Sequence, residues 1–483
     1  MYSMHVLPSF SADSPMAARW HCCRGREGRT RSAAGMAALG GMIACMVLAG
    51  AAPPSTAAEV AWLEAVEVAQ GAGEKGPWQQ NDSRYRYVDD ATVSLDPQGD
   101  AAVAWVDQAG KDVFFRRIPA NGGKPGESMG EPLNISRSAS TFSWLPRMER
   151  APDAQNTIYV LWQEIIFSGG SHGGDILIAR SDDNGSSFSP PFNVSDSVGG
   201  DGKGRINPKV WHNGSQDLVA GPGGLLYLAW TEYDGMLWFS RSQDGGRGFS
   251  RPRRIAGGGQ EKPVRAPSLA LAEDGTLYLA WTTGEDDGAD IQVAKSADGG
   301  ASFGTPVVVA PTDRYADAPK LAVGAGGALH LAYAQSDGGP FGRYSIRYTQ
   351  SADGARSFKP PKEIAVPAGG RESMHFPALA LDGRGRVVVV YEQYPDVRKD
   401  PRGLGIVISP DGGRSFSAPA AIPHSADPKG GTNGSHQGRL MEKLAVDRDG
   451  RIAIANASLL QGSHSRAWLI RGQLAPASRE FQR

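Results

Sequence analysis

One eight-residue phrase, repeated five times along the chain, constrains the fold more than any other feature of the sequence. The copies read SDDNGSSF, SQDGGRGF, SADGGASF, SADGARSF and SPDGGRSF, and they begin at Ser181, Ser242, Ser296, Ser351 and Ser409. They recur at intervals of roughly 55 to 60 residues, and regular self-similarity is typical of architectures built from one repeated supersecondary unit. We therefore expect an array of similar units.

A second phrase keeps step with the first and predicts the kind of unit. It is a turn followed by alternating apolar residues, and its copies are GDAAVAW (99–105), NTIYVLW (156–162), GLLYLAW (224–230), GTLYLAW (275–281), GALHLAY (327–333), GRVVVVY (385–391) and GRIAIAN (450–456). Flanking apolar stretches such as DIQVAKS and PVVVA complete four short strands per unit. Repeated four-stranded antiparallel units are typical of a β-propeller. The predicted fold is all-β with seven blades, or six if the first or last unit is an accessory sheet.

The octet itself predicts a tight turn between the third and fourth strands of each blade. Serine and aspartate side chains satisfy backbone N–H groups, glycine adopts backbone angles that other residues avoid, and phenylalanine anchors the turn in the blade's apolar layer. The pattern S-x-D-x-G-x-x-F closely resembles the Asp-box, or BNR, repeat of bacterial sialidases and related propellers. This resemblance implies a structural role, away from the active site, for Ser181, Asp183, Gly185, Phe188, Ser242, Asp244, Gly246, Phe249, Ser296, Asp298, Gly300, Phe303, Ser351, Asp353, Phe358, Ser409, Asp411, Gly413 and Phe416. Ala355 replaces the glycine in the fourth copy.

The two ends of the repeat array predict how the ring closes. The first unit, 88–136, carries only a degenerate turn around Asn121, and the last, 442–472, has three strands and no octet. The stretch AWLEAVEVA (61–69) is expected to supply the missing outer strand and so to join the two ends of the chain. Residues 59–483 are thus predicted to form a single propeller domain.

The first 58 residues are predicted to be a signal peptide or leader. The basic stretch RGREGRTR (24–31) precedes an apolar run (36–52) and the small residues of PPSTAAEV. The protein is therefore expected to be exported to the periplasm or secreted, without a membrane span in the mature chain. Cys22, Cys23 and Cys45, the three cysteines of the chain, lie in the leader, so no disulfide is expected in the mature protein, and lipid anchoring at Cys45 is the weaker alternative. A formal net charge of −1 gives no electrostatic case for nucleic acid as a partner.

Charged residues are predicted to gather at the mouth of the central channel. The segments entering the innermost strands carry Asp89, Arg147, Arg265, Asp317, His375 and Arg439, and Asp107, Glu164, Glu232 and Glu392 follow the second strands. In a propeller both kinds of connection emerge on one face, where both signs of charge would surround a single opening. This face is the candidate ligand site.

The resemblance to sialidases implies roles for some of these residues. Arg147, Arg265 and Arg439 would clamp the carboxylate of an anionic sugar, and Asp317 would act as the general acid. His375, from its position alone, is predicted to be a polar residue that lines the mouth and contacts the ligand. The retaining sialidases use a tyrosine nucleophile, and Tyr315 is the candidate here. Two departures oppose the assignment. No segment near the C-terminus resembles the family's setting of the nucleophilic tyrosine. Sialidases also carry a F/Y-R-I-P phrase on an innermost strand, whereas the matching letters here, FRRIP (115–119), fall on a predicted third strand.

Two classes of function therefore remain open. The first is an exported exo-sialidase-like glycoside hydrolase, and the second is a non-catalytic propeller that binds a glycan or a cell-envelope protein, or acts as a scaffold. In the second, Arg265 and Asp317 would simply pair across a blade junction. No cofactor or metal is predicted. The spacing of His172, His212 and His436 permits a metal site but does not require one. The oligomeric state is left open.

Overall fold

The computed structural model describes residues 60–77, 79, 82–122, 129–138, 141–168, 171–196, 215–231, 235–285, 288–309, 311, 314–433 and 442–476, without the side chains of 165–174. The predicted leader, 1–58, lies outside these residues. The described residues include no helix that is both long enough and apolar enough to cross a membrane.

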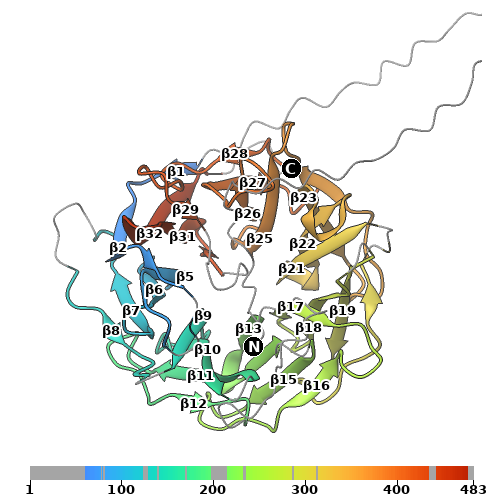
Figure 1. Ribbon diagram of the computed structural model, residues 1–483. Coiled ribbons are helices and arrows are strands. Elements are labelled where there is room, and N and C mark those ends of the chain that lie inside the picture. The colour runs from blue at the N-terminus through green and yellow to red at the C-terminus, as the bar shows by residue number, and fades with distance from the viewer. Residues whose placement is uncertain are drawn as a thin grey trace, which may run out of the picture. The chain divides into compact units, whose positions relative to one another are not determined.

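From residue 60 onward, seven antiparallel sheets follow one another around a central channel (Figure 1). Blade 1 is β5 (Val88–Leu95), β6 (Ala101–Asp107), β7 (Asp112–Ile118) and β8 (Leu133–Asn134); blade 2 is β9 (Phe142–Arg150), β10 (Ile158–Ser168), β11 (Ser171–Ser181) and β12 (Phe192–Asn193). Blade 3 is β13 (Ser215–Ala220), β14 (Leu226–Thr231), β15 (Leu237–Ser242) and β16 (Arg253–Ala256); blade 4 is β17 (Val264–Leu271), β18 (Leu277–Thr283), β19 (Asp290–Ser296) and β20 (Val307–Val308). Blade 5 is β21 (Tyr315–Val323), β22 (Leu329–Ser336), β23 (Tyr344–Ser351) and β24 (Lys362–Ala365); blade 6 is β25 (Ser373–Leu381), β26 (Val387–Tyr394), β27 (Leu404–Ser409) and β28 (Ala420–Ala421).

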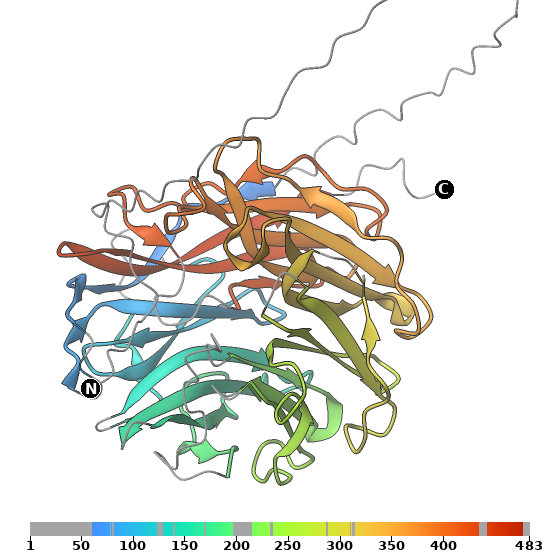
Figure 2. The same cartoon turned by 45° about the vertical axis from the view of Figure 1, so that its right-hand side comes forward.

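Blade 7 is built from both ends of the chain. Its strands are β29 (Thr432–Asn433), β30 (Leu444–Val446), β31 (Arg451–Leu460) and β32 (His464–Leu474), completed by β1 (Val60–Trp62) and β2 (Val66–Gly71). Both N-terminal strands pair antiparallel with β32, and Figures 1 and 2 show them in blue beside the red C-terminal strands. The predicted clasp and the count of seven blades are both confirmed.

Small elements complete the description. A two-stranded hairpin joins β3 (Glu74–Lys75) and β4 (Tyr85–Arg86), and three short 3-10 turns lie at η2 (Pro222–Gly224), η3 (Ala325–Gly327) and η4 (Gly339–Phe341). No α-helix occurs in the part of the chain that the structure describes. The prediction of an all-β propeller is confirmed.

The apolar core lies between neighbouring blades. The alternation in GLLYLAW and GTLYLAW sends successive side chains to opposite faces of a blade, so each face packs against the next blade. The cluster between blades 3 and 4, for example, contains Tyr227, Phe239, Leu279 and Trp281, all nearly inaccessible. Burial of such aromatic and aliphatic side chains stabilises the ring by roughly 1.5–3 kcal/mol for each.

The Asp-box turns have the location and the hydrogen bonds that their sequence predicts. In the turn after β19, Ser296 Oγ donates to Asp298 Oδ1 at 2.7 Å and accepts from the N–H of Gly300 at 2.8 Å, while Asp298 Oδ1 accepts from the N–H of Ser302 at 2.8 Å. The other four boxes repeat these three bonds. All five boxes lie between the third and fourth strands of their blades, as predicted.

The box phenylalanines anchor each turn to the preceding blade. Phe188 meets Phe115 of blade 1 edge-on at 4.9 Å between ring centroids, and Phe303 meets Phe239 of blade 3 in the same way at 5.1 Å. The anchoring role was predicted, but the partner is more specific than the blade's own apolar layer. Each box therefore fastens two blades together.

A β-bulge recurs in the innermost strands and determines what reaches the mouth. In five blades one residue adopts φ between +50° and +54° where the register with the second strand shifts: Asp90, Leu145, Ala266, Ala318 and Phe376. A bulge re-aims the side chains beside it. Arg265, Asp317 and His375 each directly precede the bulge residue, so they occupy equivalent positions in blades 4, 5 and 6.

Candidate functional site

Four of the residues predicted to form the site meet between blades 4, 5 and 6. Arg265 lies on β17, Tyr315 and Asp317 on β21, and His375 on β25. Arg265 Nε donates to Asp317 Oδ1 at 3.1 Å, and His375 Nε2 lies 4.0 Å from Asp317 Oδ2. We call Arg265, Tyr315, Asp317, His375 and the neighbouring Tyr344 the mouth cluster.

Arg265 is held on three sides by the protein itself. Besides Asp317, the hydroxyl of Tyr315 accepts a hydrogen bond from Nη2, and the carbonyl of Gly284 accepts one from Nη1. Its guanidinium also lies 5.4 Å from the ring of Tyr315. Arg265 is only 9% exposed, so its fork of donors is directed into the blade junction rather than towards a ligand.

Asp317 is a deprotonated carboxylate at neutral pH. Burial raises its pKa, but Arg265, His375 and hydrogen bonds to its oxygen from the N–H of Ala318 (2.8 Å) and the hydroxyl of Thr282 (3.1 Å) outweigh burial, so that its pKa lies below the usual range. A general acid must carry a proton at the working pH. The arrangement in the structure therefore does not prepare Asp317 for that role.

His375 contributes a flat ring that two aromatic neighbours largely cover, and its side chain is about as exposed as those of Asp317 and Arg265. Its ring stacks on Tyr344, with centroids 3.9 Å apart and planes 16° apart, and lies 3.8 Å from the ring of Phe376. Tyr344 is fixed by a hydrogen bond from its hydroxyl to the carbonyl of Pro340 at 2.9 Å. The side chain of His375 is 12% exposed. The sequence analysis missed Tyr344, because it lies on a third strand without any motif of its own.

Neither tyrosine of the cluster is activated. Burial raises the pKa of Tyr315, and the negative charge of Asp317 raises it further, while Arg265 only partly opposes this. Burial, Asp317 and Tyr315 together raise the pKa of Tyr344. A nucleophilic tyrosine needs a base or a lowered pKa, and the mouth cluster does the opposite.

Arg147 lies apart from the mouth cluster. It follows its bulge residue, Leu145, by two positions, and Trp144 takes the position that corresponds to Arg265. Its Nε donates to the carbonyl of Gln216 at 3.1 Å and its Nη1 to that of Pro146 at 3.2 Å. Arg439 lies outside the described residues. Arg147 and Arg265 have separate hydrogen-bond partners, and the predicted three-arginine clamp stays a prediction.

Two lysines that the sequence analysis missed are used in ion pairs near the channel. Lys320 on β21 pairs with Glu442, and Lys443 pairs with Glu392 of β26. The side chains of Lys443 and Glu392 are each 1% exposed, so this pair is fully desolvated. Glu392, predicted to lie at the mouth, therefore joins blades 6 and 7. Lys320 is found only once the bulge is known, because the bulge shifts the inward positions of β21 by one residue.

Glu149, on β9, is a carboxyl group whose pKa is strongly raised. Burial, Asp217 and Glu442 raise its pKa to about 8. Asp217 itself is held by N–H groups of Leu218 (3.0 Å) and Leu269 (2.8 Å), and burial raises its pKa too. The region around Arg147 is therefore rich in carboxyl groups.

The other acids predicted to lie at the mouth have local partners. Glu164 accepts hydrogen bonds from Ser143 at 2.8 Å and from Trp162 Nε1 at 3.0 Å, and Asp107 accepts one from the N–H of Ala109 at 2.9 Å. Asp89 is 1% exposed, and Glu232 lies outside the described residues. Glu164 is thus fixed by side chains of its own blade, and Asp107 accepts a bond from its own turn.

No metal centre can be assembled from the described residues, which contain no group of three or more His, Cys, Asp or Glu side chains able to hold an ion. His212 and His436 lie outside these residues, and the side chain of His172 is not described.

Comparisons with known proteins agree with the fold. No protein-family profile and no curated protein sequence matches this chain. Among solved structures, an ulvan lyase of polysaccharide lyase family PL25 is 12% identical, with a TM-score of 0.50, over 84% of this chain and 95% of the lyase. A Penicillium chrysogenum α-L-arabinanase complexed with arabinobiose is 19% identical, with a TM-score of 0.46, over 67% of this chain and 92% of that one. A Hadza microbial sialidase is 14% identical, with a TM-score of 0.44, over 76% and 73%. At such identities the likeness to the lyase shows the fold alone, and this chain is a seven-bladed β-propeller distantly similar in structure to carbohydrate-active propellers.

Proposed function

We propose that the protein is exported and binds a polar ligand such as a glycan at the mouth of its propeller, without glycosidase chemistry in the mouth cluster. The basic and apolar segments of the first 58 residues support export. The stacked and partly accessible ring of His375, beside the charged Asp317, supports binding at the mouth. Sugars stack their C–H faces on flat aromatic rings and donate hydrogen bonds from their hydroxyl groups to carboxylates.

The observation that carries the proposal is the engagement of Arg265 by Asp317, Tyr315 and Gly284. Lys320 and Lys443 are engaged by carboxylates in the same way, and Arg147 by backbone carbonyls. Among these four cations none is left to bind an anion, because releasing one would uncover a buried carboxylate or carbonyl. The ligand is therefore proposed to be a glycan without net charge, in place of the anionic sugar that the family resemblance implies.

Binding can be tested on a glycan array that carries both neutral and acidic glycans. The chain is compared with a His375→Ala variant and with Ser302→Gly, a control that alters an Asp-box turn on the opposite side of the blades. We expect His375→Ala to weaken the retained neutral glycans about tenfold, the scale of a lost aromatic contact, and Ser302→Gly to leave them unchanged. The proposal is contradicted if the chain binds no neutral glycan on the array, or if His375→Ala binds every neutral glycan as tightly as the chain does.

A sialidase activity is the second candidate, and one observation favours it. A tyrosine, an arginine and an aspartate meet within hydrogen-bond distance in the mouth cluster, as the resemblance to retaining sialidases implies. The raised pKa of Tyr315 and the lowered pKa of Asp317 oppose it. Turnover of a fluorogenic sialoside separates the two candidates.

A further inference from the structure

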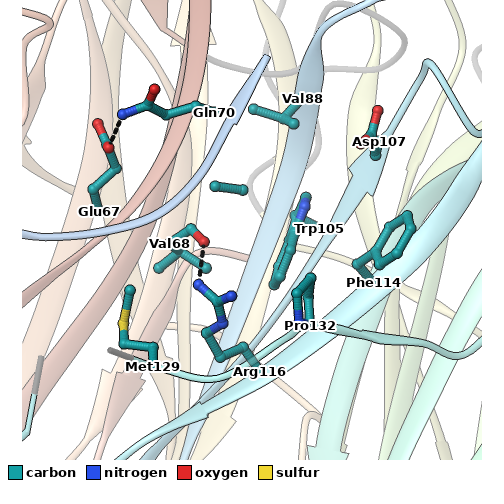
Figure 3. Close-up of a pocket in the computed structure, with 11 residues that line it drawn as sticks. Glu67, Val68, Gln70, Val88, Trp105, Asp107, Phe114, Arg116, Met129 and Pro132 are labelled. Atoms are coloured by element: carbon teal, nitrogen blue, oxygen red, sulfur yellow. Dashed lines mark hydrogen bonds between the residues drawn. The ribbon is translucent and has the colours of Figure 1, made fainter. Parts of the chain in front are cut away.

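A second cavity lies away from the mouth cluster, where the N-terminal clasp meets blade 1. It has a volume of about 370 Å³, which is at the lower end of the range of small-molecule sites. One wall is β2, the outer strand of blade 7, and the other is formed by β6 and β7 of blade 1 (Figure 3). We call it the clasp pocket. The residues of its lining that bear on ligand binding are Glu67, Gln70, Trp105, Asp107, Phe114 and Arg116.

The clasp pocket has a flat aromatic wall. Phe114 lies parallel to Trp105, with ring centroids 6.1 Å apart and planes 22° apart. Trp105, its cross-strand partner, is only 2% exposed, so the half-buried Phe114 supplies most of the accessible aromatic surface. The negative face of such a ring attracts weakly positive C–H groups, and the C–H face of a sugar ring is of this kind.

Charged and neutral polar side chains border the aromatic wall. Arg116 is fixed by hydrogen bonds from Nη1 to the carbonyl of Val68 and from Nη2 to that of Gly130, each 2.8 Å long. The amide of Gln70 donates to Glu67 at the far side of the pocket, as Figure 3 shows. Asp107 completes the lining above Trp105. Donors and acceptors therefore both border one flat apolar surface.

The charges of the lining disfavour an anion and give a cation little net attraction. Two carboxylates, Glu67 and Asp107, lie beside one guanidinium, Arg116, so an anion meets net repulsion, and Glu67 is already paired with Arg466 at 3.6 Å, which weakens its attraction for a cation. A purely apolar ligand would desolvate these charged groups without giving them partners. A molecule with many hydroxyl groups and one apolar ring face satisfies both kinds of wall.

We propose that the clasp pocket binds a neutral sugar, in the size range of a mono- or disaccharide, with the ring stacked on Phe114. Asp107 and Glu67 accept hydrogen bonds from its hydroxyl groups, and Gln70 is placed to donate one. The site is independent of the mouth cluster. It joins β2 to blade 1, so the bound sugar also links the N-terminal clasp to the rest of the ring.

The test is saturation-transfer NMR of the whole chain with glucose, galactose, mannose, N-acetylglucosamine, maltose and cellobiose. We expect at least one of these sugars to bind, and Phe114→Ala to weaken it about tenfold. Phe341→Ala is the matched control, because Phe341 is 77% exposed in blade 5 and far along the chain from the pocket. Thermal unfolding of each variant verifies that it is folded. The proposal is overturned if none of the six sugars gives a saturation-transfer signal, or if Phe114→Ala and Phe341→Ala weaken sugar binding equally.

Two further measurements separate the clasp pocket from the alternatives. Binding that is unchanged between about 50 and 300 mM salt supports a neutral ligand, whereas binding that weakens strongly over this range would mean that the site prefers a cation and would overturn the proposal. A sugar signal that His375→Ala removes and Phe114→Ala keeps belongs to the mouth, and it overturns the clasp pocket while leaving the proposed function intact.

Discussion

The Asp-box rim and the channel mouth are built in opposite ways from the same seven repeats. At the rim, five turns use the same residues and the same hydrogen bonds. At the mouth, the position before the bulge is occupied by Asp89, Trp144, Arg265, Asp317 and His375 in five different blades. Repetition at the rim follows from one shared structural task, and variety at the mouth gives the surface on which specific recognition can rest.

The shared task of the rim is to join each blade to the next. The residue directly before the box serine of one blade donates to the carbonyl of the fourth box residue of the following blade. Arg180 donates to Gly245, Arg241 to Gly299 and Gln350 to Gly412. At these three junctions the turn closes its own hairpin and also accepts a hydrogen bond from the preceding blade, so the repeated residues serve both tasks.

The largest expected effect concerns the buried pair of Lys443 and Glu392. Lys443→Met leaves the Glu392 carboxylate buried without its partner, which should cost about 3–5 kcal/mol of the free energy of unfolding. The midpoint of urea unfolding, followed by tryptophan fluorescence, measures the loss. The double variant Lys443→Met/Glu392→Leu should recover most of it, because the unpaired charge is gone. A single variant as stable as the parent would show that the pair does not hold blades 6 and 7 together.

A second expected effect on stability concerns the titration of Glu149. Its pKa is raised to about 8 in the folded protein, so the folded state binds its proton more tightly than the unfolded state does. The stability it contributes is present below the unfolded pKa of about 4.3 and is lost as the pH rises towards 8. Glu149→Gln should therefore unfold like the parent near pH 4 and at a higher temperature near pH 9. A constant difference across this range would contradict the raised pKa.

Ala355 allows the rim to be tested for coupling between blades. Its φ is +62°, where the other boxes have glycine, and the residue it faces in blade 4 is Val293 rather than an aromatic. At Gly300 an added Cβ would lie 2.6 Å from the ring of Phe239. Val293→Phe alone should therefore overpack this junction and cost about 1–3 kcal/mol. Adding Ala355→Gly should recover most of the loss in thermal unfolding, and strictly additive effects would contradict the account of the junction.

The smallest expected effect sharpens the equivalence of the boxes. Four boxes carry a serine whose hydroxyl donates to the second oxygen of the box aspartate, but the third-blade box has Gly248 there. A Cβ at Gly248 would lie 3.1 Å from Asp244 Oδ2, so a serine fits. Gly248→Ser should stabilise the protein by less than about 1 kcal/mol, and Ser302→Gly should destabilise it by a similar amount. A loss of stability on Gly248→Ser would mean that the third turn differs from the others.

The fold could be predicted because its repeated features are local. The octet and the alternating strand phrase depend on neighbouring residues, whereas the clasp at 61–69 was predicted from the outer strand that the last unit lacks, and the structure confirms all three. The mouth was predicted only in part. Arg265, Tyr315, Asp317 and His375 do meet, because equivalent positions of adjacent blades are neighbours.

The remaining residues of the mouth depend on backbone geometry that the sequence does not state. The bulges change the register of the innermost strands by one residue, which separates Arg147 from Arg265 and brings in Lys320. Tyr344 reaches His375 from a third strand with no motif. Lys443 and Glu392 are 51 residues apart in the sequence, so their pairing could be found only from the structure.

The central claim is that the mouth cluster binds but does not cleave, and fluorophore release from a fluorogenic sialoside tests it most directly. The chain is assayed at high enzyme concentration beside Tyr315→Phe, with Tyr333→Phe as the matched control because Tyr333 is a buried tyrosine of β22 outside the cluster. The account predicts no release above background by any of the three. Release by the chain and by Tyr333→Phe that disappears in Tyr315→Phe would contradict it and would establish Tyr315 as a catalytic residue.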